Sequence, residues 1–161
     1  MQNPQLPEEV HTTRPCPSRN VEAALAEAEA LTAANGQRLT AIRRKVLELL
    51  LRSPAPAKAY DLLGRLDGEG AAKPPTIYRA LNFLQDAGLA HKIESLNAYV
   101  ACGHARHSHS AIFLICESCG SAEELRGAVT YDAIKEETEA AGFRTEHTVV
   151  EARGTCRACQ G

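Results

Sequence analysis

Two pairs of cysteines with the same spacing constrain this 161-residue chain more than any other feature. Cys116 and Cys119 form one Cys-x-x-Cys pair, which Gly120 follows, and Cys156 and Cys159 form the second. Two cysteines three apart on a tight turn can direct both sulfur atoms at one ion, and glycine allows the positive φ of that turn. Two such pairs together predict a four-thiolate zinc site.

A zinc site of this composition is structural, because four thiolates complete the tetrahedral sphere and leave no position for catalysis. Rubredoxin-like iron and redox-active Cys-x-x-Cys pairs are the alternatives. The sequence has no run of eighteen apolar residues and no charged-then-apolar signal pattern at its start, so we expect a cytoplasmic chain without a membrane partner. In that reducing compartment, paired cysteines are more often metal ligands or redox groups than disulfides.

Charge is divided unevenly along the chain, although the net charge is only −2. Residues 35–92 hold ten Lys and Arg against five Asp and Glu, a net of +5. Residues 93–161 hold six against ten, a net of −4. A basic half followed by an acidic half suggests a polyanion-binding module joined to a different one, although ordinary solvated surfaces also produce imbalances of this size.

Apolar residues recur at three- and four-residue steps in four segments before residue 90. The predicted helices run from Asn20 to Asn35-Gly36, from Thr40 to Pro54, from Ala57 to Leu66 and from Pro74-Pro75 to Gly88. A β-hairpin follows, with strands His91–Glu94 and Tyr99–Cys102. Helices followed by a hairpin have the order of a winged helix-turn-helix, whose last helix enters the major groove of DNA.

The fourth predicted helix has one apolar face and one polar face. Ile77, Ala80, Leu81 and Leu84 form the apolar face. The polar face carries residue types that bond phosphates and base edges, although a plain solvated face is the alternative. The predicted DNA contacts are Lys73, Thr76, Tyr78, Arg79, Asn82 and, in the hairpin, Lys92.

The sequence after residue 110 has an α+β pattern. Its predicted elements are strands at Ala111–Ile115 and Ser121–Leu125, a helix at Val129–Ala141 and a strand at Phe143–Glu151. Because sequentially adjacent strands tend to pair, we expect a small three-stranded antiparallel sheet with one helix. Such a sheet is marginal by itself, so zinc and dimerisation are expected to stabilise it.

The expected fold is therefore α+β, an N-terminal winged helix-turn-helix domain followed by a small antiparallel α/β dimerisation domain stapled by zinc. The expected divisions are a disordered, proline-rich tail at 1–19, the winged-helix domain at 20–102, a linker at 103–110 and the dimerisation and zinc-binding domain at 111–161.

A second set of possible metal ligands lies around the hairpin and the linker. It consists of His91, Cys102, His104, His107, His109 and the pair Glu123-Glu124. One cysteine, two histidines and a carboxylate would form a closed tetrahedral site that bridges the two domains. The thiolate favours zinc over ferrous iron or manganese, which prefer harder ligands. For His104 and His107, a solvated histidine-rich loop is the alternative.

Several strings in the chain resemble the ferric uptake regulator superfamily. They are Tyr60-Asp-Leu-Leu, KPPTIYRALNFLQDAGLAHKIES at Lys73–Ser95, and Asn97-Ala-Tyr99. HSAIFLICESCG at His109–Gly120 and HTVVEARGTCRAC at His147–Cys159 resemble its zinc uptake regulator branch. The resemblance covers about residues 20–161. It implies a homodimeric repressor, not an enzyme, that binds palindromic DNA operators of zinc uptake genes when loaded with zinc.

The resemblance also implies roles for single residues and two zinc ions per chain. Cys116, Cys119, Cys156 and Cys159 would hold the structural zinc, and His91, Cys102, His109 and Glu124 the regulatory zinc. The Tyr-Arg pair of the family's recognition helix falls on Tyr78 and Arg79. His104 and His107 depart from the family pattern. They could replace His109 or build a further site with His147, for which an ordinary partly buried histidine is the alternative.

Other functions are weighed against this one. An iron- or peroxide-sensing regulator of the same superfamily is disfavoured by Cys102, because those sensors resemble sites of histidine and carboxylate only. A zinc hydrolase or a thiol redox enzyme is disfavoured because the sequence has no HExxH and no Ser/His/Asp set. A protein that only stores zinc is a third alternative, and such a protein would bind no operator DNA.

Overall fold

The computed structural model describes residues 20–66, 73–103, 111–146 and 148–160. The helices are α1 (Val21–Ala34), α2 (Ala41–Arg52), α3 (Ala59–Leu66), α4 (Pro74–Asp86) and α5 (Ala128–Ala140), with short 3₁₀ turns η2 (Glu94–Leu96) and η3 (Arg157–Cys159). The strands are β1 (Ala90–Ile93), β2 (Ala98–Ala101), β3 (Ala111–Cys116), β4 (Ala122–Arg126) and β5 (Val150–Gly154). The predictions for the tail at 1–19 and for His104, His107, His109 and His147 fall outside the described residues.

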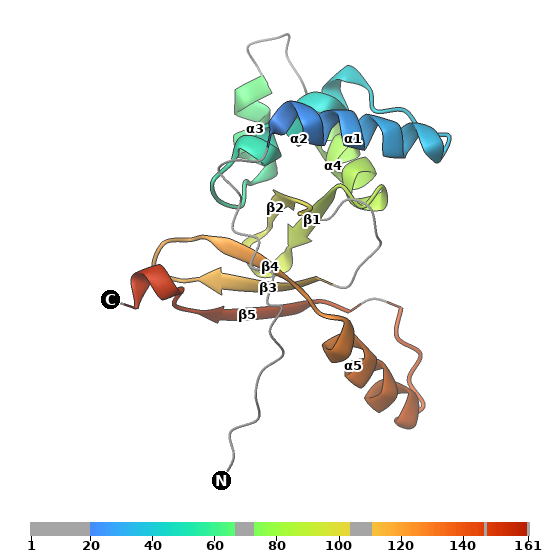
Figure 1. Cartoon of the computed structure of the whole chain (residues 1–161), viewed down its shortest axis with the longest axis vertical. Coiled ribbons are helices and arrows are strands. Elements are labelled where there is room, and N and C mark those ends of the chain that lie inside the picture. Colours follow the sequence, from blue (N-terminus) through green and yellow to red (C-terminus); the bar gives the residue numbers. More distant parts are fainter. Residues whose placement is uncertain (1–19, 67–72, 104–110, 147, 161) are drawn as a thin grey trace.

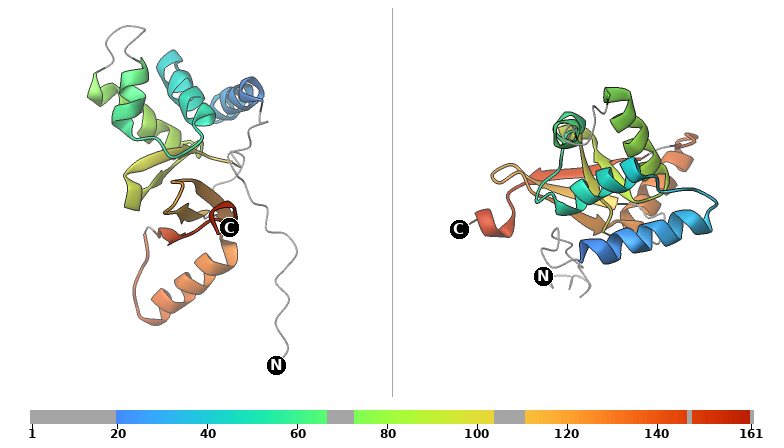
Figure 2. Two further views of the ribbon diagram at one scale, coloured as in Figure 1. Left: turned by 90° about the vertical axis from the view of Figure 1, so that its left-hand side faces the viewer. Right: turned by 90° about the horizontal axis from the view of Figure 1, so that it is seen from above.

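Helices α1–α4 lie together at one end of the molecule, and the β1–β2 hairpin separates them from the sheet of β3, β4 and β5 (Figure 1). Helix α5 projects from that sheet, away from the other helices (Figures 1 and 2). Among the described residues, no helix combines the length and the apolar character needed to cross a membrane.

The first four helices share one apolar core. Leu25 of α1, Val46 of α2, Leu62 of α3 and Leu81 of α4 are completely buried, and each belongs to the apolar residues that recur at three- and four-residue steps in its segment. Burying a side chain of this size is worth roughly 1.5–3 kcal/mol. The periodicity of the sequence therefore accounts for the packing of this part of the fold.

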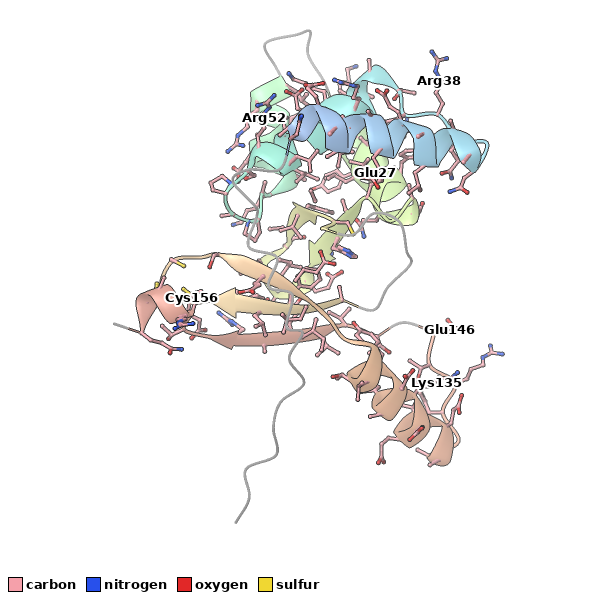
Figure 3. The ribbon with its side chains drawn as sticks, viewed as in Figure 1. Glu27, Arg38, Arg52, Lys135, Glu146 and Cys156 are labelled. Atoms are coloured by element: carbon pink, nitrogen blue, oxygen red, sulfur yellow. The ribbon has the colours of Figure 1, made fainter. Side chains whose placement is uncertain are left out.

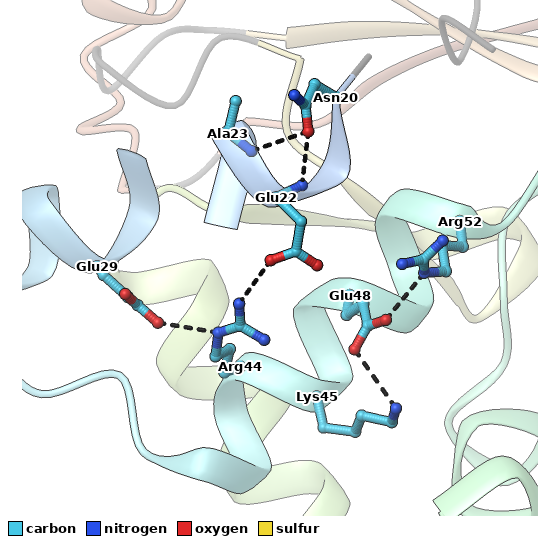
Figure 4. A network of polar contacts seen from close by, with 8 residues as sticks. All are labelled: Asn20, Glu22, Ala23, Glu29, Arg44, Lys45, Glu48 and Arg52. Atoms are coloured by element: carbon cyan, nitrogen blue, oxygen red, sulfur yellow. Dashed lines mark hydrogen bonds and ion pairs between the residues drawn. The ribbon is translucent and has the colours of Figure 1, made fainter. Parts of the chain in front are cut away.

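Polar contacts at the surface tie α1 to α2 (Figure 4). The guanidinium of Arg44 lies 3.0 Å from the carboxylate of Glu22 and 2.9 Å from that of Glu29. The Asn20 side chain accepts hydrogen bonds from the first N–H groups of α1, at 3.1 and 3.2 Å, and so caps the helix. Exposed ion pairs contribute little to stability because water screens them, so these contacts orient α1 while the apolar core holds it.

The β1–β2 hairpin follows α4 directly and contacts the helices. Gly88 has φ +67°, which turns the chain sharply out of α4, and β1 then pairs with β2 in antiparallel register, with His91 opposite Val100. An isolated bridge between Ala57, which precedes α3, and Tyr99 of β2 ties the hairpin to the helices. The predicted order of a winged helix-turn-helix is confirmed.

The sheet differs from the predicted antiparallel one. Its order is β4-β3-β5, with β3 antiparallel to β4 but parallel to β5. The chain leaves β4, runs through α5 and returns at the same end of the sheet. It then adds β5 on the far edge of β3, and a strand placed there must run parallel to β3.

The last strand is also shorter than predicted. Phe143 closes α5 instead of starting the strand, because its N–H donates to the carbonyl of Thr138 at 2.8 Å while Gly142 takes φ +71°. This is the usual glycine-dependent end of a helix. Strand β5 begins only at Val150.

The hairpin packs directly on the sheet. Ile93, at the end of β1, is completely buried against Ala111, Phe113 and Ile115 of β3. Leu96, Val100 and Ala122 border this second apolar cluster. The cluster gives the hairpin one defined position over the sheet.

Candidate metal centres and nucleic-acid interface

The four predicted structural cysteines converge at one end of the sheet. Their sulfur atoms all lie within 4.8 Å of one another, and Cys119 Sγ is 3.8 Å from Cys156 Sγ. Gly120 has φ +71° and donates its N–H to the carbonyl of Cys116, so the first pair forms the predicted tight turn. Figure 3 shows Cys156 at the end of β5, beside that turn.

The parallel pairing of β3 and β5 brings the two cysteine pairs together. Cys116, the last residue of β3, lies opposite Gly154, the last residue of β5, so the second pair begins beside the first. The backbone N–H of Cys156 donates to Cys116 Sγ at 3.3 Å. An antiparallel β5 would have carried Cys156 to the opposite end of the sheet.

Hydrogen bonds lower the pKa values of some of these thiols and raise that of another. The N–H groups of Cys156 and then Cys119 lower the pKa of Cys116 to about 6, and the Ser121 hydroxyl lowers the pKa of Cys119. Side-chain hydrogen bonds with Cys156 and Cys119 raise the pKa of Cys159 to about 12. Four adjacent thiols cannot all ionise without a cation between them. A tetrahedral set of four sulfur atoms suits zinc.

Three residues of the second predicted site also converge, at the junction of hairpin and sheet. The donor atoms of His91, Cys102 and Glu124 lie within 4.8 Å of one another, and His91 Nε2 is 3.8 Å from Glu124 Oε1. Cys102 is 3 % exposed and Glu124 is 6 % exposed. The set offers one nitrogen, one sulfur and one oxygen. Its donors therefore fit zinc better than a harder cation.

Two further contacts orient the ligands of this second cluster. Glu124 Oε2 accepts a hydrogen bond from the N–H of Gly103 at 3.0 Å, and the His91 ring lies 5.4 Å from the Phe113 ring. Of the pair Glu123-Glu124, the residue that the family resemblance singled out, Glu124, joins the cluster, whereas Glu123 does not belong to it. Alternation along β4 separates the two side chains.

The polar face of α4 is exposed in the way its sequence predicts. Ile77, Ala80, Leu81 and Leu84 are buried. Lys73, Tyr78, Arg79 and Asn82 are exposed, and Thr76 is partly exposed. In the hairpin, the ammonium group of Lys92 pairs with the Glu94 carboxylate, which reduces the charge available for a phosphate.

One exposed aromatic residue was not among the predicted contacts. Tyr60, near the start of α3, is 79 % exposed. In a helix-turn-helix the helix before the recognition helix crosses the DNA backbone, where a tyrosine hydroxyl can bond a phosphate. Its place two residues before the buried Leu62, which puts it on the other side of α3, was a usable signal in the sequence.

The chain joins a winged helix to a small mixed sheet. One candidate metal centre lies at their junction and another at the end of the sheet. These features define a class of two-part proteins in which metal can act on the winged helix. The family model described as the ferric uptake regulator family matches residues 34–153. The chain belongs to that family.

Two relatives show which members it resembles. The zinc uptake regulation protein of Escherichia coli (strain K12) is 41 % identical over 137 residues, covering 84 % of this chain and 80 % of that protein. A solved zinc uptake regulator complexed with zinc and DNA is 38 % identical, with a TM-score of 0.84, and the match covers 88 % of this chain and 95 % of that one.

A third relative, XcZur, has been solved in two forms. Its holo form gives a TM-score of 0.81 at 40 % identity, covering 86 % of this chain and 97 % of that one. Its apo form gives a TM-score of only 0.50 at 39 % identity, covering 88 % of this chain and 98 % of that one. Because the identities are nearly equal, the spatial arrangement of the chain accounts for the difference. The structure described here is more similar in arrangement to the holo form than to the apo form.

Proposed function

We propose that this chain is a zinc-responsive transcriptional repressor that binds palindromic operators of zinc uptake genes as a homodimer. The observation that supports this most is the convergence of His91 and Cys102, from the hairpin, with Glu124, from the sheet. A ligand that binds all three groups stabilises the arrangement in which hairpin and sheet are in contact. The similarity to the zinc- and DNA-bound relative supports zinc as that ligand.

In this proposal each chain holds two zinc ions. Cys116, Cys119, Cys156 and Cys159 bind the structural ion, and His91, Cys102, Glu124 and His109 bind the regulatory ion. His109 is the fourth ligand by its place in the sequence, and it lies outside the described residues. Zinc bound there would neutralise the charges of these ligands, and the chain's own packing then holds the winged helix.

The proposed mechanism depends on the orientation of α4. Residues 20–102 form the DNA-binding domain, 103–110 the linker and 111–161 the dimerisation domain. When the hairpin is fixed to the sheet, the two α4 helices of a dimer face successive major grooves, one helical turn apart. The DNA contacts are Lys73, Thr76, Tyr78, Arg79, Asn82 and Lys92. A regulator of this kind works in the cytoplasm.

Helix α5 supports dimerisation. No residue of α5 whose burial is described is buried, and Val129 is 84 % exposed. Phe143, just after the helix, is 63 % exposed. Apolar groups left uncovered in this way mark a protein interface, and a second copy of the chain would cover them symmetrically.

The direct test is a gel shift on palindromic AT-rich DNA with free zinc buffered from chelated to saturating levels. We expect the protein to bind this DNA only when free zinc is available. After a chelator has removed the zinc, adding iron or manganese should not restore binding. Binding that ignores zinc, or that responds to iron alone, would overturn the proposal.

A substitution on α4 tests the DNA-binding surface separately. Arg79→Ala is expected to weaken operator binding by at least about tenfold, because a bidentate arginine contact to a base is worth roughly 1–3 kcal/mol. Zinc content and unfolding should match the unchanged protein, since Arg79 is exposed. Arg144→Ala, whose side chain is 91 % exposed beyond α5, is the control and should bind normally. Equal affinities for the two variants would exclude Arg79 from the interface.

A further inference from the structure

Strand β5 makes a polar contact with the hairpin that involves neither cysteine cluster. The backbone N–H groups of Glu94 and Ser95 in η2, the turn of the hairpin, donate to the two carboxylate oxygens of Glu151 at 2.7 and 3.2 Å. One carboxylate therefore caps two adjacent N–H groups at the start of a turn, and hydrogen bonds to a charged acceptor are stronger than neutral ones.

The sheet register aligns this contact with the second cluster. Phe113 of β3 lies opposite Glu124 on β4 and opposite Glu151 on β5, so the three side chains form one row across the face that meets the hairpin. Glu124 contacts the hairpin's base, through His91 and the N–H of Gly103. Glu151 contacts the turn at its other end. Phe113, between them, packs in the apolar cluster under Ile93.

We propose that Glu151 is a positioning residue, a metal-independent latch that holds the hairpin turn on the sheet and thereby raises the affinity of the His91, Cys102 and Glu124 cluster for zinc. This inference rests on the proposed function. The contact joins parts of the chain 56 and 57 residues apart, so it exists only when hairpin and sheet are together. Zinc at the cluster requires the same arrangement. Two interactions that stabilise one state strengthen each other.

The test compares Glu151→Ala and Glu151→Gln with the unchanged full-length chain, each carrying its structural zinc. Glu151→Ala should raise the free zinc needed for half-maximal operator binding about tenfold, while binding at saturating zinc still reaches the normal level. Glu151→Gln keeps one carbonyl acceptor but loses the charge, so its shift should be smaller. The control is Glu29→Gln, whose carboxylate pairs with Arg44 between α1 and α2, far along the chain from hairpin and sheet, and should cause no shift.

A second readout does not depend on DNA. In the zinc-loaded protein, the amides of Glu94 and Ser95 should exchange with deuterium faster in Glu151→Ala than in the unchanged chain, while amides of the α1–α4 core keep their protection. A residue that merely supports the sheet would instead speed exchange along β3 and β5 and release the structural zinc.

The outcomes separate this inference from the proposed function. A zinc midpoint and a turn exchange rate that are both unchanged in Glu151→Ala would overturn the latch, even if the unchanged chain responds to zinc. Operator binding that is independent of zinc in the unchanged chain would overturn the proposed function. The exchange measurement would then still decide whether Glu151 holds the turn.

Discussion

Replacing Cys116 with serine is expected to release the structural zinc and unfold the sheet and α5. Cys116 is buried at the end of β3, and its sulfur lies within 4.8 Å of the three other sulfur atoms of the cluster. Structural zinc contributes about 10–16 kcal/mol to the folding of zinc-finger peptides, which is as much as the whole net stability of an ordinary domain. This part of the chain has three strands and a helix in which no residue of described burial is buried, so it has little apolar packing to replace the zinc.

The measurements are zinc content per chain and far-UV circular dichroism during urea unfolding. Cys116→Ser should lose one zinc per chain, lose dimerisation and unfold its C-terminal part without urea, while the α1–α4 core still unfolds cooperatively. Cys16→Ser, whose cysteine belongs to neither proposed ligand set, is the matched control. A Cys116→Ser protein that keeps its full zinc content and its dimer would show that the cluster is not a structural centre.

Replacing Cys102 with serine is expected to abolish the zinc response of DNA binding and leave a folded dimer. The Cys102 side chain is buried beside His91 and Glu124, and its backbone N–H bonds to the carbonyl of Leu89 at 2.9 Å whatever the side chain. To move a competent fraction of about 1 % to near saturation, zinc must favour that state by about 5.5 kcal/mol. Losing the thiolate should cut operator affinity at saturating zinc by about 100-fold.

The same zinc-buffered gel shift measures this effect, and metal analysis should show that the structural zinc is retained. Glu124→Gln should have a similar phenotype, although its remaining carbonyl can still accept the hydrogen bond from Gly103. The contrast between Cys102→Ser and Cys116→Ser is the decisive one. If both variants simply unfolded, the division into a regulatory and a structural centre would be wrong.

Local patterns in the sequence were sufficient for much of the fold. The apolar spacing predicted α1–α4 and their buried faces, because helix formation and burial depend on residues three and four apart. Each Cys-x-x-Cys pair is equally local, since it forms within one turn, whereas the parallel pairing of β3 with β5 is what joins the two pairs into one four-sulfur cluster. Gly88 and Gly120 occupy the positive-φ positions that their turns require.

Other features depended on long-range packing, which local patterns do not encode. Residue type alone offered Glu123 and Glu124 equally; the family resemblance singled out Glu124, and the register of β4 with β3 directs its side chain to the cluster. The antiparallel pairing predicted for the neighbouring strands β3 and β4 is confirmed, but the prediction was wrong for β5, which runs parallel to β3 because α5 carries the chain to the far edge of that strand.

The sequence by itself determined the winged helix, the types of metal ligand and the family to which the chain belongs, since these follow from local spacing and from motifs. Only the tertiary structure decided how the hairpin sits on the sheet. The burial of Ile93 against Phe113 and the bonds of Glu151 to the hairpin turn join segments far apart in the sequence. Such contacts form only after both parts have folded and packed, so no local pattern can specify them.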